Sequence, residues 1–188
     1  MPRIEIVPYR TEWPGEFAAI GLALRRILGE RAVAIHHIGS TSVPGMPAKD
    51  VIDVQITVSS FSAEIEEDLV EGGFTMSLYR SDHCPPGLIL ADAELEKRLF
   101  GNPGRRGNLH MRQSGRFNQR YPLLCRDFLR ANSMAANAYA EIKRQLARHF
   151  PDDVEAYYDI KDPVFDALMA GANQWAKSED WLPAPTDA

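Results

Sequence analysis

Hydrophobic residues near the start of the chain change their spacing, and this change predicts the first elements. From Thr11, large apolar residues recur every three or four positions, the spacing of one helical face, until Gly29 ends the run. Residues 32–38 and 50–58 are short runs rich in β-branched residues, and strict alternation in the second is typical of a half-buried strand. We therefore predict a helix packed on two neighbouring strands.

The rest of the chain divides into further short elements and a helical end. Paired glycines and a glycine-rich basic loop separate the short elements, whereas apolar residues beyond residue 119 return to helical spacing. The expected elements are a helix over 62–72, strands over 74–79, 95–100 and 108–112, helices over 123–131 and 133–150, and helical pieces over 152–175.

These elements predict an α+β protein with a small mixed β-sheet flanked by helices and a C-terminal helical region. A chain of 188 residues suits one domain. We place this domain over residues 1–176, with a sheet-containing core over about 1–115 and a helical part over about 118–176. Residues 177–188 hold two prolines and no periodicity, so we expect a loosely docked tail.

Composition excludes several classes of protein. Lys and Arg number 21 against 26 Asp and Glu, a net charge of −5 that argues against general nucleic-acid binding. No apolar run approaches the length of a membrane span, and the start lacks the apolar core of a signal peptide. We expect a cytoplasmic protein that does not interact with membranes; the sequence leaves its oligomeric state open.

Polar residues that could carry chemistry cluster on one face of the predicted sheet. Side chains alternate along a strand, so Asp53 and Gln55 share the polar face of the second strand, and His110 and Arg112 share a face of a later strand. Residues 39–42, Gly-Ser-Thr-Ser, supply backbone N–H groups and hydroxyls suited to phosphate oxygens. Together these groups could hold a metal-nucleotide.

Each of these signals also has a purely structural explanation. Asp53 could form a buried salt bridge with Lys49 or an arginine, and a small polar turn is common in any protein. His110 could be a half-buried histidine bonded to a neighbour. Arg105 and Arg106 lie on a loop that could close over a triphosphate, although exposed basic loops are usually only solvated.

Several stretches match the motifs of one known family. The most specific covers residues 37–45, His-Ile-Gly-Ser-Thr-Ser-Val-Pro-Gly, and is followed by Lys49 and Asp53. Residues 108–110 and 128–132 match as well. The chain therefore resembles the GrpB family, also called UPF0157, nearly from end to end.

That resemblance implies a nucleotidyltransferase-like fold, because the family is placed in that superfamily. It also implies a Gly-Ser turn for a triphosphate and carboxylates on two strands for Mg²⁺ or Mn²⁺. Gly39 matches the turn together with Ser40, and Asp53 matches the first carboxylate. Gln55 stands where a second carboxylate is expected, and His110 lies in the strand where a third is expected.

The resulting hypothesis is a metal-dependent enzyme that moves a nucleotidyl group, usually adenylyl from ATP, to a small-molecule acceptor. The transfer would be the whole reaction or the activation step of a ligase. The alternative is a non-catalytic protein that binds a nucleotide or phosphometabolite at a degraded site, and a Gln55→Asp variant discriminates between the two. Candidate catalytic residues are Asp53 and His110, candidate metal ligands are Asp53, Gln55 and His110, and candidate phosphate ligands are Gly39, Ser40, Thr41, Ser42, Lys49, Arg112 and Lys143.

Overall fold

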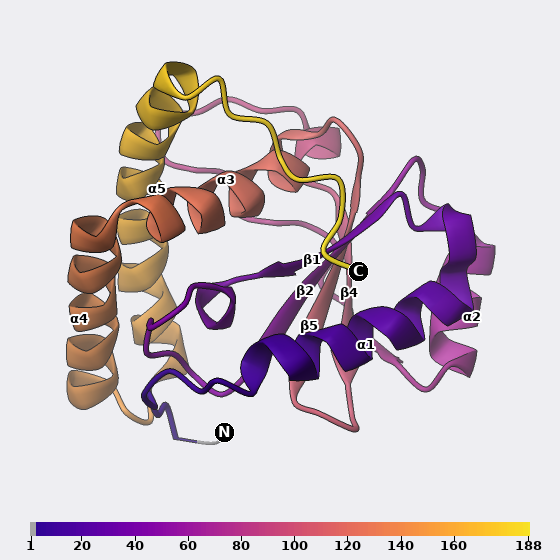
Figure 1. Cartoon of the computed structure of the whole chain (residues 1–188), viewed down its shortest axis with the longest axis horizontal. Helices are drawn as coiled ribbons and strands as arrows, with labels where there is room; N and C mark the ends of the chain where they lie inside the picture. Colours follow the sequence, from indigo (N-terminus) through magenta and orange to yellow (C-terminus); the bar gives the residue numbers. More distant parts are fainter. Residues whose placement is uncertain (1–2) are drawn as a thin grey trace.

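A five-stranded mixed sheet forms the centre of the computed structural model, which describes residues 3–188 (Figure 1). The strand order is β1-β2-β5-β4-β3, in which only β2 and β5 run parallel. The predicted class, an α+β protein with a mixed sheet flanked by helices, is confirmed. The strands are β1 (Ala34–Ile38), β2 (Ile52–Val58), β3 (Thr75–Met76), β4 (Lys97–Asn102) and β5 (Gly107–Gln113).

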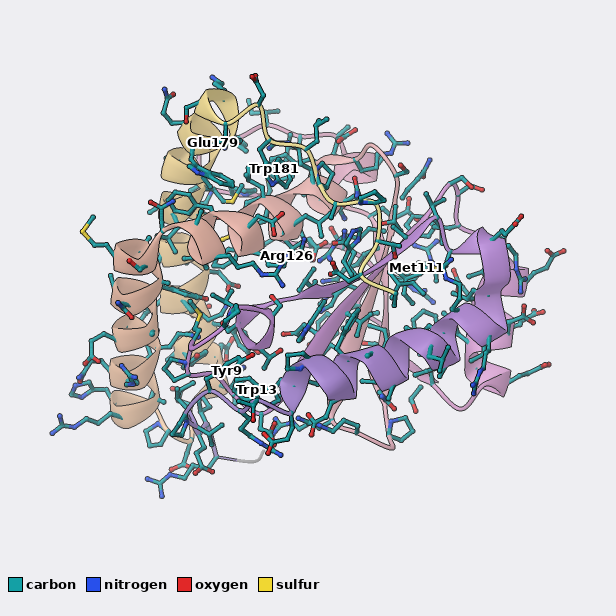
Figure 2. The ribbon with its side chains drawn as sticks, in the orientation of Figure 1. Tyr9, Trp13, Met111, Arg126, Glu179 and Trp181 are labelled. Atoms are coloured by element: carbon teal, nitrogen blue, oxygen red, sulfur yellow. The ribbon has the colours of Figure 1, made fainter. Side chains whose placement is uncertain are left out.

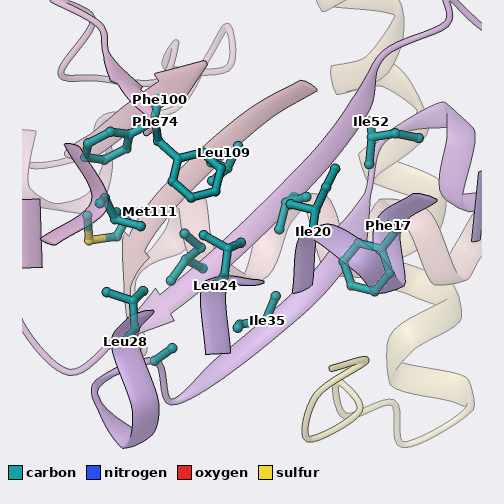
Figure 3. Packing of buried hydrophobic residues seen from close by; sticks show 14 of the residues in the cluster. Phe17, Ile20, Leu24, Leu28, Ile35, Ile52, Phe74, Phe100, Leu109 and Met111 are labelled. Carbon is teal, nitrogen blue, oxygen red and sulfur yellow. The ribbon is translucent and has the colours of Figure 1, made fainter. Parts of the chain in front are cut away.

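One face of the sheet is buried under α1 (Trp13–Leu28) and α2 (Ala63–Glu71). Ser62 caps α2 by accepting a hydrogen bond from the backbone N–H of Ile65. The apolar positions of β2 that alternate with Asp53 face this layer, as the pattern predicts. Figure 3 shows part of this packing; the residues that it labels from α1 and the strands are Phe17, Ile20, Leu24, Leu28, Ile35, Ile52, Phe100, Leu109 and Met111.

The opposite side carries the helical region, α3 (Phe117–Ala131), α4 (Ser133–His149) and α5 (Val154–Ser178) (Figure 1). These helices share a second apolar core that includes Leu124, Tyr139 and Ala172. The helical pieces expected over 152–175 form one helix that continues through Pro163. A proline removes one helical hydrogen bond, and packing of α5 on α3 and α4 offsets that loss.

Two segments differ from the sequence-based expectation. The strand expected over 74–79 shortens to β3, and the chain then forms a long loop to β4. The tail is held along the free edge of β1: the N–H of Asp187 donates to Ile35 O (2.9 Å), and its carboxylate accepts from the N–H of His37 (2.9 Å). An edge strand needs such partners, and its pattern does not reveal where they come from.

No helix within residues 3–188 is both long and apolar enough to cross a membrane.

Candidate functional site

A cavity of about 400 Å³ lies between the open face of the sheet and the helical region. The turn after β1, the polar ends of β2 and β5, and side chains from α3, α4 and α5 line it. We call it the first cavity. Seven of the predicted site residues reach it: Gly39, Ser40, Thr41, Lys49, Asp53, His110 and Lys143.

Gly39 allows the turn to pack directly against Asp53. Its φ is +70°, in the region that favours glycine, and a Cβ atom there would lie 2.5 Å from an oxygen of Asp53. The hydroxyl of Ser42 donates to Gly39 O (2.6 Å), and that of Thr41 lies 3.0 Å from Nε2 of His37. Both hydroxyls therefore shape the turn, and the structure places Ser42 outside the first cavity.

Asp53 is the one carboxylate among the residues that line the first cavity. Its Oδ1 accepts a hydrogen bond from the side-chain amide of Asn108 (2.9 Å) and lies 3.7 Å from Nε2 of His110. Burial acts to raise the pKa of Asp53, but His110, Asn108 and the nearby charge of Lys49 hold it below its usual value. Asp53 is thus ionised at neutral pH.

His110 is neutral at the same pH. Burial lowers its pKa, the positive charges of Arg112 and Lys97 lower it further, and Asp53 only partly opposes them. An Nη2 atom of Arg112 lies 3.5 Å from Nδ1 of His110. Because guanidinium is a donor only, we infer that Nδ1 carries the lone pair and that the proton on Nε2 faces Asp53.

Lys49 does not form the ion pair with Asp53 that would give this carboxylate a purely structural role. Its ammonium donates instead to the hydroxyl of Tyr158 (2.6 Å).

Gln55 and Arg112 share the polar face with Asp53 but lie outside the first cavity. The amide of Gln55 is fully engaged: it donates to Gln119 O (2.8 Å) and accepts from Arg112 (2.9 Å). The same guanidinium donates to both oxygens of Asp82 (2.8 and 3.0 Å). The geometry therefore does not support Gln55 as a metal ligand or Arg112 as a phosphate ligand.

Positive charge dominates the rest of the first cavity. Lys143 is buried, and its ammonium donates to Pro47 O (2.7 Å). No carboxylate within residues 3–188 forms an ion pair with it, and burial together with the charges of Lys161 and Lys49 lowers its pKa to about 7. The other cationic side chains that line the first cavity are Lys49, Arg106, Arg126 and Lys161.

The two arginines of the hairpin loop have separate positions. Arg105 makes ion pairs with Glu16 (2.7 Å) and Asp50, which tie the loop to the base of α1. Arg106 lines the first cavity. The sequence does not distinguish these neighbours, because the carboxylates that pair with Arg105 lie far away along the chain.

Sequence reasoning missed Arg126, Tyr158 and Lys161. Figure 2 shows Arg126 below α3, on the side facing the sheet, where it donates to His37 O (3.1 Å). Lys161 lies on α5, in a stretch without a recognisable motif. Basic residues on amphipathic helices are usually solvated, so the sequence contains no signal that separates these from the others.

The side chains at this site do not fit a metal held by protein ligands alone. Within residues 3–188, no group of three or more His, Cys, Asp or Glu side chains could hold a metal ion. Asp53 fits as a single ligand to a Mg²⁺ or Mn²⁺ ion that is also bound by substrate phosphates. His110 fits poorly as a second ligand, because its one lone pair faces Arg112.

The turn, the carboxylate strand and the helical region form an arrangement that extends over most of the chain, and comparison with known proteins identifies it. A family model described as GrpB protein matches residues 3–170. The chain belongs to the GrpB family. The crystal structure of conserved protein GrpB from Enterococcus faecalis has a TM-score of 0.69 and 25% identity, covering 95% of this chain and 100% of that chain.

Two curated relatives illustrate the range of GrpB proteins. UPF0157 protein BH1888 of Halalkalibacterium halodurans is 33% identical over 172 residues, which cover 90% of this chain and 83% of the relative. A Mycolicibacterium paratuberculosis protein named dephospho-CoA kinase is 34% identical over 201 residues, covering 96% of this chain but 48% of the relative. The chain thus spans about half the length of that kinase, whose name describes the longer protein.

Proposed function

We propose that the first cavity binds the phosphates of a nucleoside triphosphate and that the protein transfers the nucleotidyl group to a small acceptor. The observation that carries this proposal is the buried ammonium of Lys143, which has no carboxylate partner within residues 3–188. A buried ammonium without a carboxylate partner is costly, and an anionic ligand would remove that cost. Of the five cations around the first cavity, Arg126 and Lys161 are paired with carboxylates, whereas Lys49, Lys143 and Arg106 form no ion pair within residues 3–188 and can offset the charge of a triphosphate.

In the proposed transfer, the residues that line the first cavity would have separate roles. The turn at Gly39 and Ser40 presents backbone N–H groups and a hydroxyl to phosphate oxygens, as the GrpB resemblance implies. Lys49, Lys143 and Lys161 offset the charge that develops on the leaving pyrophosphate. Asp53 accepts the proton of the attacking group; the side-chain amide of Asn108 orients this carboxylate, and His110 faces it with its Nε2–H.

A divalent ion would enter with the phosphates, with Asp53 as its protein ligand. When bound, it would polarise the transferred phosphoryl group as a Lewis acid. Gln55 and His110 are not part of this proposed metal site.

A second candidate is a protein that binds a nucleotide or phosphometabolite without turnover. The engagement of Gln55 by Arg112 favours it, because the position of the expected second carboxylate has no access to the first cavity. Both candidates require the same phosphate site, and only the first requires product formation.

Thermal unfolding with each of ATP, GTP, CTP and UTP tests the shared part, with and without Mg²⁺ or Mn²⁺. At about 100 times Kd, a ligand adds roughly 2.7 kcal/mol, which corresponds to roughly 5–10 °C for a chain of this size. Lys143→Met should reduce the shift strongly. Lys177→Met, which replaces an exposed lysine on α5, should leave it unchanged.

No shift with any nucleotide would contradict both candidates. A shift without transfer of label from α-labelled nucleotide, across a broad set of acceptors, would favour the binding protein.

A further inference from the structure

A second cavity of about 340 Å³ adjoins the first. It lies over β4 and β5 and under residues 81–85 of the long loop before β4. The two cavities share one wall, formed by His110, Pro122, Tyr158, Lys161 and Phe165. A ligand in one would therefore be close to a ligand in the other.

The order of groups across the sheet gives this second cavity a specific position. The turn follows β1, Asp53 lies on β2, His110 lies on β5, and the second cavity extends beyond His110 toward Lys97 on β4. A nucleotide whose outer phosphates lie on the turn would direct its α-phosphate toward Asp53 and His110. An in-line displacement brings the attacking atom from the side opposite the leaving group, which is the side of the second cavity.

Charges in the second cavity are already paired, in contrast to the first. The carboxylate of Asp82 accepts hydrogen bonds from Arg112 and from Lys97 (2.6 Å), and Asp162 pairs with Lys161 (2.6 Å). A further anion would meet no unpaired buried cation here comparable to Lys143. This balance favours an uncharged ligand over a nucleotide or nucleic acid.

Ring-bearing side chains line the same space. Phe117, Tyr121 and Phe165 contribute aromatic surface, which packs well against a planar ring. His83 contributes a polar atom: its Nε2 lies 3.1 Å from both oxygens of Asp166, and this carboxylate also accepts a hydrogen bond from Tyr121. Nδ1 of His83 forms no hydrogen bond within residues 3–188 and is free to bind a ligand hydroxyl.

We propose that the second cavity is the acceptor subsite and that it takes an uncharged, ring-bearing small molecule with a hydroxyl group. This inference rests on the proposed function. In the transfer, the acceptor oxygen forms a bond to the α-phosphorus, and the bond from that phosphorus to the bridging oxygen breaks. The electron pair leaves with pyrophosphate, and the hydroxyl proton passes to Asp53.

Matched pairs of probes test this subsite without needing turnover. Thymidine and 4-methylphenol, with thymidine 5′-monophosphate and 4-methylphenyl phosphate as their charged counterparts, are screened by saturation-transfer NMR in the presence of ATP. At least one uncharged probe should bind more tightly than its phosphate. His83→Ala and Phe117→Ala should weaken that binding at least tenfold, and His149→Ala, which replaces an exposed histidine on α4, should not change it.

Stabilisation by ATP tests the phosphate site in the first cavity separately from the subsite in the second. It should be the same in wild type, His83→Ala and Phe117→Ala, because neither side chain lines the first cavity. Competition between ATP and the bound probe would overturn the subsite, as would binding that neither substitution affects, or no binding by any uncharged probe. If ATP does not stabilise the wild type while an uncharged probe still binds, the result would instead contradict the proposed function.

Discussion

The polar face of the sheet has two ends that differ in how their charges are compensated. At one end, Asp53, Asn108 and His110 border an open cavity with an excess of cations. At the other, Gln55 and Arg112 form a closed network with Asp82. Strand alternation places both sets on the same face, and the β2–β5 register sets Gln55 beside His110.

The difference arises from elements packed above the face. Asp82, on the loop before β4, and the backbone of α3 at Gln119 satisfy the closed end. The open end receives Lys143 from α4, which has no carboxylate partner within residues 3–188, and Lys161 from α5, which is paired with Asp162. A polar strand position is thus structural or available for ligand binding according to what lies above it.

Arg112→Met should have the largest effect. It removes the buried guanidinium that binds both oxygens of the half-buried Asp82, which keeps Lys97 as a partner, and leaves the amide oxygen of Gln55 without its donor, so we expect a loss of about 2–4 kcal/mol in the free energy of unfolding. Chemical denaturation measures this loss. Arg144→Met, at an exposed pair with Glu141, should cost less than about 0.5 kcal/mol. Equal effects of the two substitutions would show that the closed network is not a stabilising unit.

Gln55→Asp should destabilise the protein without creating a metal site. The variant loses the donor to Gln119 O and directs its carboxylate at Arg112, for an expected cost of about 1–3 kcal/mol. Denaturation and metal-dependent nucleotidyl transfer are measured together, with Gln174→Asp on the exposed side of α5 as the control. An increase in metal-dependent transfer would place Gln55 in the site after all.

Lys143→Met should stabilise the free protein by on the order of 2 kcal/mol near neutral pH. The folded-state pKa of about 7 lies below the unfolded value, so the unfolded chain binds this proton more readily. The penalty is full below about pH 7 and fades as the pH rises toward the unfolded pKa. The gain should therefore be larger at pH 6.5 than at pH 9.5 in denaturation experiments.

The ammonium of Lys143 should also couple nucleotide binding to proton uptake. Bound phosphates would raise the pKa of Lys143, so binding at pH 7.5 should take up protons. Calorimetry in buffers of different ionisation enthalpy measures this uptake, which Lys143→Met should abolish and Lys177→Met should leave intact. Proton uptake that is identical in all three proteins would assign it to another group.

Arg106→Ala should have the smallest effect and act on binding alone. We expect ATP affinity to fall about 3–10-fold, because one exposed cation at the rim is lost, with a stability change under about 0.5 kcal/mol. Arg105→Ala should do the reverse: it loses ion pairs to Glu16 and Asp50 at a cost of about 1 kcal/mol. Calorimetric titration and denaturation of both variants distinguish the two roles, and an equal loss of affinity in both would contradict them.

Periodicity within single segments predicted much of the fold. The apolar stripe from Trp13 and the alternation around Asp53 depend on neighbours a few residues away, and α1 and β2 follow them closely. Boundaries were less accurate where tertiary packing overrides local signals. Thus α3 begins at Phe117 rather than Leu123, and α5 continues past Pro163.

Motifs and local geometry were sufficient to predict the family, the fold class, the Gly-Ser turn at Gly39 and the shared face of Asp53 and His110. Which polar groups stay available to a ligand depends on tertiary packing. Asp82, the partner of Arg112, lies 30 residues away in the sequence, and Gln119, the partner of Gln55, lies 64 residues away. Lys143 has no carboxylate partner within residues 3–188. Charge compensation is a property of neighbours in space, so no local pattern contains it.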